Sequence, residues 1–292
     1  DAPLDAADVS AWCPLPAPDA RSPVPGISVP IPGARCPMPG ARSPVGAVDW
    51  MPRLDETRFD ADIARILAHI TAGDTYQVNY TFPLDASFPH DPWPWFAACA
   101  RKARVPFAAC IDMGAAVVIS LSPELFIERT GGDVRTRPMK GTTRRGRWLA
   151  EDVALADALQ ASDKARAENV MIVDLLRNDL GRLAQPGSVR VSDLCAIERY
   201  PTVWQMTSRV DARVSGGTDL WALLSAVFPC GSVTGAPKVR TMQIIADLEI
   251  APRGIYTGAI CLLKPGGDLM ASVPIRTAVL DRLTQRATFS VG

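Results

Sequence analysis

Short apolar runs bounded by turn-forming residues are the feature of this sequence that most limits the folds open to it. Residues 115–120, 125–128 and 134–137 each predict a short strand, and residues 255–263 and 269–280 predict a hairpin around Pro-Gly-Gly. Helical patterns separate some of these runs, but there is no regular strand–helix–strand alternation. Hairpins mixed with helices favour an α+β fold built on antiparallel sheets.

Helices are expected where apolar spacing and end signals agree. One begins near Asp55 and ends at Gly73, and its apolar stripe consists of Phe59, Ile63, Ile66, Leu67 and Ile70. The others cover residues 151–160, residues 164–180 with Asp163 as the cap and Gly181 as the stop, and residues 237–248. Alternating apolar residues at 189–191 and 202–214 predict further strands.

Residues 1–52 differ from the rest because they hold 12 of the 26 prolines of the chain. Proline removes backbone donors and blocks helices, and this segment has few large apolar residues to offset the entropy cost of ordering. We therefore predict a disordered proline-rich arm followed by one ordered domain over residues 53–292. Removal of residues 1–50 is expected to change stability little.

The composition argues against several classes of function. Acidic and basic residues balance at 31 each without a block of like charge, so neither nucleic acid nor a membrane surface is expected as a partner. No apolar stretch reaches spanning length and no signal peptide is visible. The seven cysteines are scattered without a Cys-x-x-Cys pair, which favours a reducing cytoplasm. With only His69 and His90, a zinc site or a Ser-His-Asp triad is not expected.

Lys140 lies in the segment Arg-Pro-Met-Lys-Gly-Thr at 137–142, at the end of a predicted strand. A lysine between proline and glycine is held near the backbone. Partial burial near other cations would lower its pKa and make the amine a nucleophile. An ordinary solvated lysine is the alternative, and the spacing alone favours it.

Glu168 lies on an apolar predicted helix, on the same face as Ile172 and Asp179. A carboxylate on a core-facing stripe needs a partner, and a hard cation is one candidate. A salt bridge to Arg177 or Arg182 is the other, and the spacing alone favours the salt bridge.

Two further segments place polar groups beside glycine. The loop at 231–236 lacks the Gly-Lys-Ser/Thr of a phosphate loop, but its backbone amides, just before a helix with Pro237 near its start, could face an anion such as a carboxylate. Tyr256 and Arg276 lie on neighbouring predicted strands, and arginine is a natural bidentate clamp for a carboxylate. A buried structural arginine is the alternative for Arg276.

Taken in order, these segments resemble the chorismate-binding enzyme family over residues 55–292. The specific motifs are Glu-Asn-Val-Met-Ile-Val-Asp-Leu-Leu-Arg-Asn-Asp-Leu-Gly at 168–181 and Gly-Ser-Val-Thr-Gly-Ala-Pro-Lys at 231–238. Tyr-Gln-Val-Asn at 76–79 fits the same family, nearest its aminodeoxychorismate branch. The resemblance implies an α/β/β/α sandwich of antiparallel sheets with outer helices, here incomplete.

Within this family the residue before Gly-Thr distinguishes the reactions, and Lys140 matches the lysine of the aminodeoxychorismate branch. The resemblance implies that its amine attacks ring carbon two of chorismate and displaces the hydroxyl at carbon four. Ammonia then enters at carbon four and expels the lysine, which gives 4-amino-4-deoxychorismate for para-aminobenzoate and folate biosynthesis. Glu124 matches the carboxylate thought to assist proton transfer at the departing hydroxyl.

The resemblance also implies a cofactor, substrate contacts and a partner. Glu168 matches one of two glutamates that hold magnesium, and Tyr256 and Arg276 match residues that hold the enolpyruvyl carboxylate. Ammonia is expected from a separate glutamine amidotransferase subunit, and nothing in this chain resembles its cysteine–histidine site. The other expected substrate contacts are Gly141, Thr142, Thr234 and Gly292.

The chain departs from the family pattern in three places. Gln205 stands where many members have a histidine, so any role of that histidine falls to Gln205 or to no residue. The proline-rich arm replaces the N-terminal region of the family. The chain stops at Gly292, the first glycine of a Gly-x-Gly substrate loop, before the helix expected to carry the second metal glutamate. We therefore expect a domain truncated at both ends.

Two alternatives stay open. One is another chorismate enzyme, chiefly the anthranilate synthase large subunit, and product analysis with chorismate and ammonium would separate the two. The other is a non-catalytic remnant, and a magnesium-binding measurement would test it. For an active enzyme, we expect Lys140, Glu168, Tyr256 and Arg276 to share one ligand-sized site.

Overall fold

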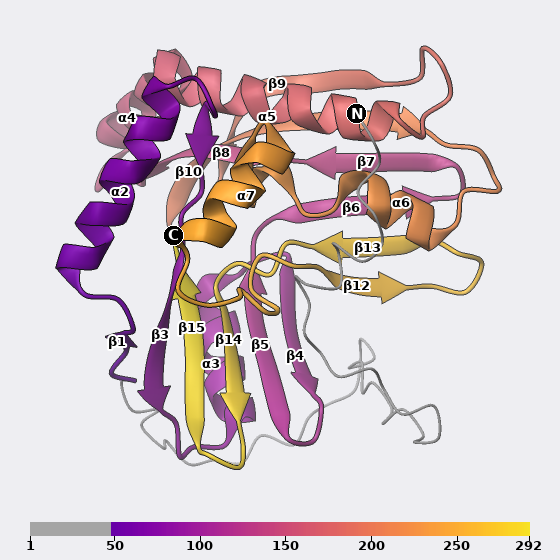
Figure 1. Ribbon diagram of the computed structural model, residues 1–292. Coiled ribbons are helices and arrows are strands. Elements are labelled where there is room, and N and C mark those ends of the chain that lie inside the picture. The colour runs from indigo at the N-terminus through magenta and orange to yellow at the C-terminus, as the bar shows by residue number, and fades with distance from the viewer. Residues whose placement is uncertain (1–47) are drawn as a thin grey trace.

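The computed structural model of the protein describes residues 48–292, which fold into two large antiparallel sheets with helices on their outer sides. Figure 1 shows one sheet below, with upright strands, and the other above it, with strands running across the view. A small third sheet pairs β2 (Gln77–Val78) with β11 (Gly235–Ala236). The arrangement confirms the predicted α+β class with antiparallel pairing. Within the same residues, no helix has both the length and the apolar character needed to cross a bilayer.

The lower sheet has the strand order β1-β3-β15-β14-β5-β4. Val117 and Ile119 of β5 are 1% exposed, and they belong to a core against which Trp95 and Phe96 of helix α3 (Pro92–Ala103) pack. Its strands are β1 (Met51–Pro52), β3 (Phe82–Ser87), β4 (Phe107–Asp112), β5 (Ala116–Ser122), β14 (Thr277–Asp281) and β15 (Arg286–Val291).

The upper sheet has the order β12-β13-β6-β7-β10-β8, and β9 pairs with β10 as well. The predicted hairpin around Pro-Gly-Gly is confirmed, although its first strand begins at Ile260 instead of Ile255. The strands are β6 (Leu125–Thr130), β7 (Asp133–Arg137), β8 (Met139–Arg144), β9 (Arg190–Arg199), β10 (Val203–Arg213), β12 (Ile260–Leu263) and β13 (Leu269–Ser272).

The chain crosses between the two sheets at two adjacent points. Strand β5 belongs to the lower sheet and β6 to the upper sheet, with Glu124 between them, whereas β13 and β14 make the reverse crossing through residues 273–276. The prediction of one continuous strand over 269–280 is therefore wrong. Pro274 cannot donate to a ladder, and Arg276 has a φ of 54°, so neither residue continues a regular strand.

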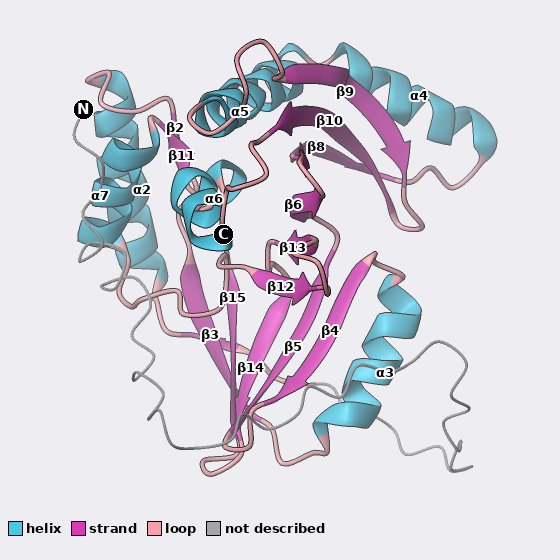
Figure 2. Cartoon of the chain, turned by 90° about the vertical axis from the view of Figure 1, so that its right-hand side faces the viewer, coloured by secondary structure: helices cyan, strands magenta, loops and turns pink. Residues whose placement is uncertain are grey.

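Helices α4 (Leu149–Ala161) and α5 (Asp163–Gly181) cover the outer face of the upper sheet (Figure 2). Ile172, Leu176 and Leu180 of α5 are at most 1% exposed and form the centre of the largest core cluster. The helix α5 ends at Gly181 as predicted. Its cap, however, is Ser162 and not Asp163, because the Ser162 hydroxyl accepts a hydrogen bond from the Ala165 amide at 3.3 Å.

Helices α2 (Glu56–Thr71) and α7 (Lys238–Leu248) lie side by side and cover the end of β3 and β2 (Figure 1). Ile66, Ile244 and Leu248 form their shared core. The predicted start of α2 is confirmed, since Asp55 accepts a hydrogen bond from the Arg58 amide at 2.8 Å. The remaining helical elements are α6 (Leu220–Val227) and the short 3-10 turn η1 (Gly231–Val233).

The ordered domain begins before the predicted boundary at residue 53. Trp50 lies with its ring 5.5 Å from that of Phe289, and β1 pairs with β3. Val48 also packs on the lower sheet. Residues 48–52 are therefore part of the domain. The rest of the predicted arm, residues 1–47, lies outside the described residues, and its disorder stays a prediction.

Two deletions test where the domain begins. Removing residues 1–47 is expected to leave the melting temperature almost unchanged, because of the proline content of that segment. Removing residues 1–52 also deletes the buried face of Trp50 and strand β1. That loss should cost about 2 kcal/mol and lower the melting temperature by about 5 °C. Equal melting temperatures for the two deletions, measured by circular dichroism, would contradict this boundary.

Candidate active site

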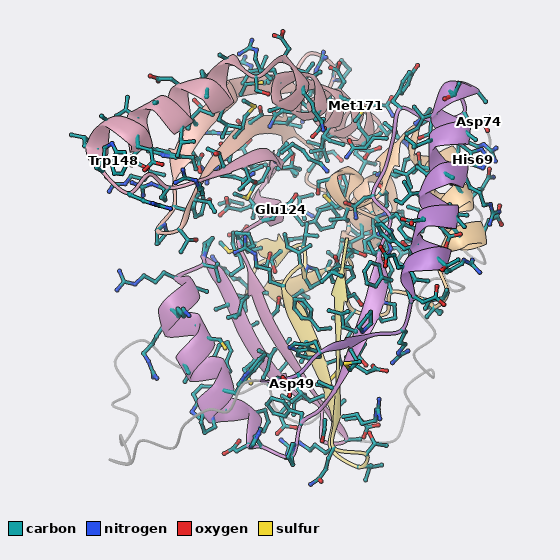
Figure 3. All side chains as sticks on the ribbon, turned by 90° about the vertical axis from the view of Figure 1, so that its left-hand side faces the viewer. Asp49, His69, Asp74, Glu124, Trp148 and Met171 are labelled. Carbon is teal, nitrogen blue, oxygen red and sulfur yellow. The ribbon has the colours of Figure 1, made fainter. Side chains whose placement is uncertain are left out.

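Glu124 lies at the crossing from the lower to the upper sheet, near the centre of the molecule (Figure 3). Its amide donates a 3.1 Å hydrogen bond to Oγ of Ser122, and its carbonyl accepts one of 3.2 Å from the amide of Val273. The side chain is 3% exposed, and its Oε1 accepts a 2.6 Å hydrogen bond from Oγ of Ser232. The backbone of Glu124 is thus fixed by both crossing segments.

The carboxyl group of Glu124 has an unusual protonation equilibrium. Burial raises its pKa to about 7, although the hydrogen bond from Ser232 and the charge of Lys140 both act to lower it. A carboxyl group with this pKa can hold a proton near neutral pH and also release it. Such a group is suited to general acid–base work.

Lys140 lies in a β-bulge at the edge of the upper sheet. Strand β10 pairs Gln205 with Thr142 and Thr207 with Met139, so Lys140 and the next residue together oppose one residue of β10. The bulge needs glycine after Lys140, because Gly141 has a φ of 92°. An added Cβ on Gly141 would also lie only 3.0 Å from Cβ of a residue of α5. The bulge places Lys140 outside the regular alternation of the strand.

Lys140 is half-buried, so it is not a freely solvated lysine. Burial lowers the pKa of its amine, while the neighbouring Glu124, Glu168 and Cys230 act to raise it. The lowering was expected from partial burial near other cations. Burial is indeed its cause, but the charged neighbours are the carboxylates of Glu124 and Glu168, which act in the opposite direction. In residues 48–292, no direct ion pair involves Lys140. The amine is therefore influenced by the carboxylates of Glu124 and Glu168 without forming a direct ion pair with either.

Gln205 and Thr142 hold the strand just after Lys140. The amide of Gln205 donates a 2.9 Å hydrogen bond to the carbonyl of Gly141, and its Oε1 accepts one of 2.8 Å from the hydroxyl of Thr142. Both ends of the Gln205 side chain, which is 8% exposed, are thus used on this turn. Gln205, which stands where many family members have a histidine, therefore supports the bulge.

Glu168 lies in the second turn of α5 with 36% of its side chain exposed. Its nearest basic partner is Lys164, at 4.0 Å on the same helix. The predicted alternatives do not form, since Arg177 pairs with Asp174 at 2.8 Å. The next residue, Asn169, is fully buried, and its amide lies 3.5 Å from the carbonyl of Lys140. This contact holds the Glu168 turn against strand β8.

The carboxylate of Glu168 has the oxygen chemistry that magnesium prefers, and its ion pair is a long one of 4.0 Å to the exposed Lys164. Residues 48–292 contain no cluster of three or more carboxylate, histidine or cysteine groups. Glu168 therefore fits magnesium as a single carboxylate ligand, with the other positions left to water, substrate or further protein ligands.

The loop between α6 and α7 is buried and internally bonded. The hydroxyl of Thr234 donates to the carbonyl of Cys230 at 3.1 Å, and the carbonyl of Thr234 accepts from the amide of Asn79 at 2.8 Å. A buried ion pair, which was not predicted, fixes its end: Nζ of Lys238 lies 2.5 Å from Oδ2 of Asp179. The signal was present in the sequence, because each residue belongs to one of the two family motifs.

Tyr256 and Arg276 lie in two neighbouring turns and not on neighbouring strands. The amide of Thr257 donates to the carbonyl of Pro274 at 3.2 Å, which joins the turns. Tyr256 is 9% exposed, and burial raises the pKa of its hydroxyl. Arg276 is exposed at the crossing between the sheets, so it is not a buried structural arginine.

The structure brings Lys140, Glu124 and Glu168 together. Within the described part of the chain, no hydrogen bond or ion pair joins Tyr256 or Arg276 to Lys140 or Glu168. That these residues share one site with Lys140 stays a prediction. Gly292 follows β15 and packs against the backbone of Tyr80, just before β3. A Cβ added to Gly292 would lie only 2.6 Å from the carbonyl oxygen of Tyr80.

Two polar residues near the loop between α6 and α7 were not predicted from the sequence. Arg253, whose side chain is 9% exposed, donates 2.6 Å hydrogen bonds to the carbonyls of Val233 and Asn79 and pairs with Glu249 at 2.6 Å. Gln77 has a buried Oε1 without a hydrogen-bond partner in residues 48–292. Arg253 carried a weak signal, an acidic and a basic residue four apart at the end of a predicted helix. Gln77 belongs to the Tyr-Gln-Val-Asn motif at 76–79, which indicated the family but no role for this residue.

Residues 32–292 match the family described as chorismate binding enzyme. Aminodeoxychorismate synthase component 1 of Klebsiella aerogenes is 42% identical over 228 residues, which are 78% of this chain and 51% of that protein. Anthranilate synthase component 1 of Streptomyces coelicolor is 39% identical over 236 residues, which are 80% of this chain and 46% of that protein.

The fold is shared with solved structures. The crystal structure of anthranilate synthase component I from Streptococcus pneumoniae superposes with a TM-score of 0.78 at 31% identity, over 85% of this chain and 54% of that one. The chain spans about half the length of the curated relatives that it matches.

Proposed function

Because this chain belongs to the chorismate-binding enzyme family, we propose that it aminates chorismate at ring carbon four to give 4-amino-4-deoxychorismate, the precursor of para-aminobenzoate. The observation that carries this proposal is the half-buried Lys140 beside the buried Glu124. The first residue can act as a nucleophile and the second as an acid, and the proposed amination at carbon four uses both roles.

In the first step, the neutral amine of Lys140 attacks ring carbon two and forms a carbon–nitrogen bond. Both conjugated double bonds of the ring shift by one position, and the bond between carbon four and its hydroxyl breaks. Glu124 supplies a proton to the departing oxygen, which leaves as water. The lowered pKa of Lys140 supports this step, because only an unprotonated amine can attack.

In the second step, ammonia attacks carbon four and both ring double bonds shift back. The bond between carbon two and Nζ of Lys140 breaks, which releases the lysine and the product. Glu124, now ionised, can take the excess proton of the incoming nitrogen. The bulge at Gly141 and the clamp from Gln205 keep the lysine in one place through both steps.

The same proposal includes magnesium and carboxylate binding. Glu168 would hold a magnesium ion, which supplies positive charge for the ring carboxylate of the substrate. Arg276 and Tyr256 would hold the enolpyruvyl carboxylate, with Thr142, Thr234, Gly141 and Gly292 as further contacts. The exposed position of Arg276 at the crossing between the sheets is compatible with a ligand contact.

We propose a glutamine amidotransferase subunit as the source of ammonia. The name of the Klebsiella aerogenes relative, component 1, implies that it works with another component. An external ammonium salt should replace that partner in a test of the chemistry.

Anthranilate formation is the second candidate, because the relatives include anthranilate synthases over the same part of the chain. Incubation with chorismate, magnesium and ammonium, followed by chromatography and mass spectrometry of the products, distinguishes the two. We expect 4-amino-4-deoxychorismate. Anthranilate and pyruvate as the main products would overturn the proposed function in favour of the second candidate.

A further inference from the structure

A chain of three buried side chains leads to Glu124 from the loop after α6. Oγ of Ser232 lies 2.6 Å from Oε1 of Glu124, and Sγ of Cys230 lies 3.1 Å from Oγ of Ser232. None of the three residues is more than 4% exposed. Of these three residues, only Glu124 has a role in the proposed reaction steps.

The direction of these hydrogen bonds follows from proton counting. A serine hydroxyl has one proton, and Ser232 donates it to Oε1 of Glu124. Ser232 can therefore only accept from Cys230, whose thiol must carry its proton. Burial keeps that proton in place, because it raises the pKa of the Cys230 thiol to about 12. The chain of donors thus runs from Cys230 through Ser232 to Glu124.

The second carboxyl oxygen of Glu124 has a different environment. No hydrogen bond from residues 48–292 reaches Oε2. The two oxygens are therefore not equivalent. Oε1 accepts a hydrogen bond from Ser232, whereas Oε2 has no donor among the described residues.

We propose that Ser232 is a positioning residue that reserves Oε1 of Glu124 as an acceptor. The acidic proton then resides on Oε2, which has no donor from residues 48–292 and which we assign as the oxygen that acts on the substrate. Cys230 supports this arrangement by donating to Ser232. The inference rests on the proposed function, in which Glu124 protonates the departing hydroxyl. It adds the reason why that proton is on the correct oxygen.

The charged groups that influence Glu124 stay the same when Ser232 is changed. Lys140 of β8 favours the ionised carboxylate, and Glu168 of α5 acts on Lys140 in turn. Cys230 also faces Lys238 of α7. A shift in the protonation of Glu124 in a Ser232 variant therefore reports the lost hydrogen bond.

The sign of that shift tests the proposal. Glutamate labelled with 13C at its carboxyl carbon allows an NMR titration of Glu124 in the 292-residue chain, with Glu124→Gln to assign the signal. In Ser232→Ala, the ionised carboxylate loses a donor, so its pKa should rise by about one unit above that of the unsubstituted chain. If Glu124 instead donated its proton to Ser232, the neutral acid would lose a partner, and the pKa would fall.

Matched variants separate positioning from a general structural effect. Ser232→Thr keeps the hydroxyl and should restore the original pKa. Ser120→Ala removes another fully buried serine hydroxyl, one bonded to Thr277, and should leave the pKa of Glu124 unchanged. Cys230→Ala should give a smaller rise, and this variant also serves if Ser232→Ala fails to fold. A fall, or no change, in the pKa of Glu124 in Ser232→Ala or Cys230→Ala overturns the proposal.

The titration needs no substrate, so its failure is distinct from failure of the proposed function. A chain that shows the expected rise but makes no aminated product would overturn the function and leave the hydrogen-bond chain intact. A chain that aminates chorismate without the expected rise would overturn only the role of Ser232.

Discussion

Lys140→Ala is expected to lose at least roughly a hundredfold in the rate of 4-amino-4-deoxychorismate formation, even at saturating ammonium. The variant lacks the amine that is proposed to attack carbon two and displace the hydroxyl at carbon four. Chorismate should still bind, because Glu168 and Arg276 are unchanged. Direct attack of ammonia at carbon two, which leads to anthranilate, should become relatively favoured.

The measurement is product quantification by mass spectrometry against the unsubstituted chain. Lys164→Ala is the matched control, since it removes an exposed lysine that lies 4.0 Å from Glu168 on α5. Its rate should stay within a factor of a few. Full activity of Lys140→Ala with added ammonium would show that Lys140 is not the nucleophile.

Glu124→Gln is expected to lower the rate by roughly a hundred- to ten-thousandfold. Glutamine has nearly the same shape and can still accept the hydrogen bond from Ser232, but it cannot supply a proton. In the unsubstituted chain, the first step needs the protonated acid, so its rate should fall as pH rises above about 7. The variant should lose this limb of the pH–rate profile. An unchanged profile would contradict the assignment of Glu124 as the acid.

The same substitution has a stability effect whose sign follows from linkage. The pKa of Glu124 is about 7 in the folded chain against 4.5 for the free group, so the folded state binds the proton more tightly. The resulting stabilisation is complete below pH 4.5 and is lost as pH rises to about 7. Glu124→Gln removes this dependence and should be the more stable protein at pH 8, by about 3 kcal/mol at most. Urea unfolding at pH 5 and pH 8 measures the difference.

Local signals in the sequence were enough to predict several elements. Asp55 caps α2, and the hairpin of β12 and β13 turns at Pro-Gly-Gly, because these choices depend on neighbouring residues alone. Motifs also identified the family, since their residues are chemically unusual: Glu168 is a carboxylate on an apolar helix, and Lys140 lies between proline and glycine.

Features that depend on distant parts of the chain could not be predicted. Pro274 marked a possible break within residues 269–280, but nothing in the local pattern showed that β13 and β14 belong to different sheets. The pairing of Asp179 with Lys238 and of Glu124 with Ser232 each needs two segments brought together by the fold. Helix α3 was also missed, because its stripe of aromatic and small residues is interrupted by proline at its start.

The most direct test of the proposed chemistry is mass spectrometry of the chain after incubation with chorismate and magnesium in the absence of ammonia. Attack by Lys140 with loss of water should leave a covalent adduct on the peptide that contains Lys140. The adduct should be absent in Lys140→Ala, present in Lys164→Ala, and discharged when ammonium is added. Formation of 4-amino-4-deoxychorismate by a chain that never carries an adduct on Lys140 would contradict the covalent mechanism.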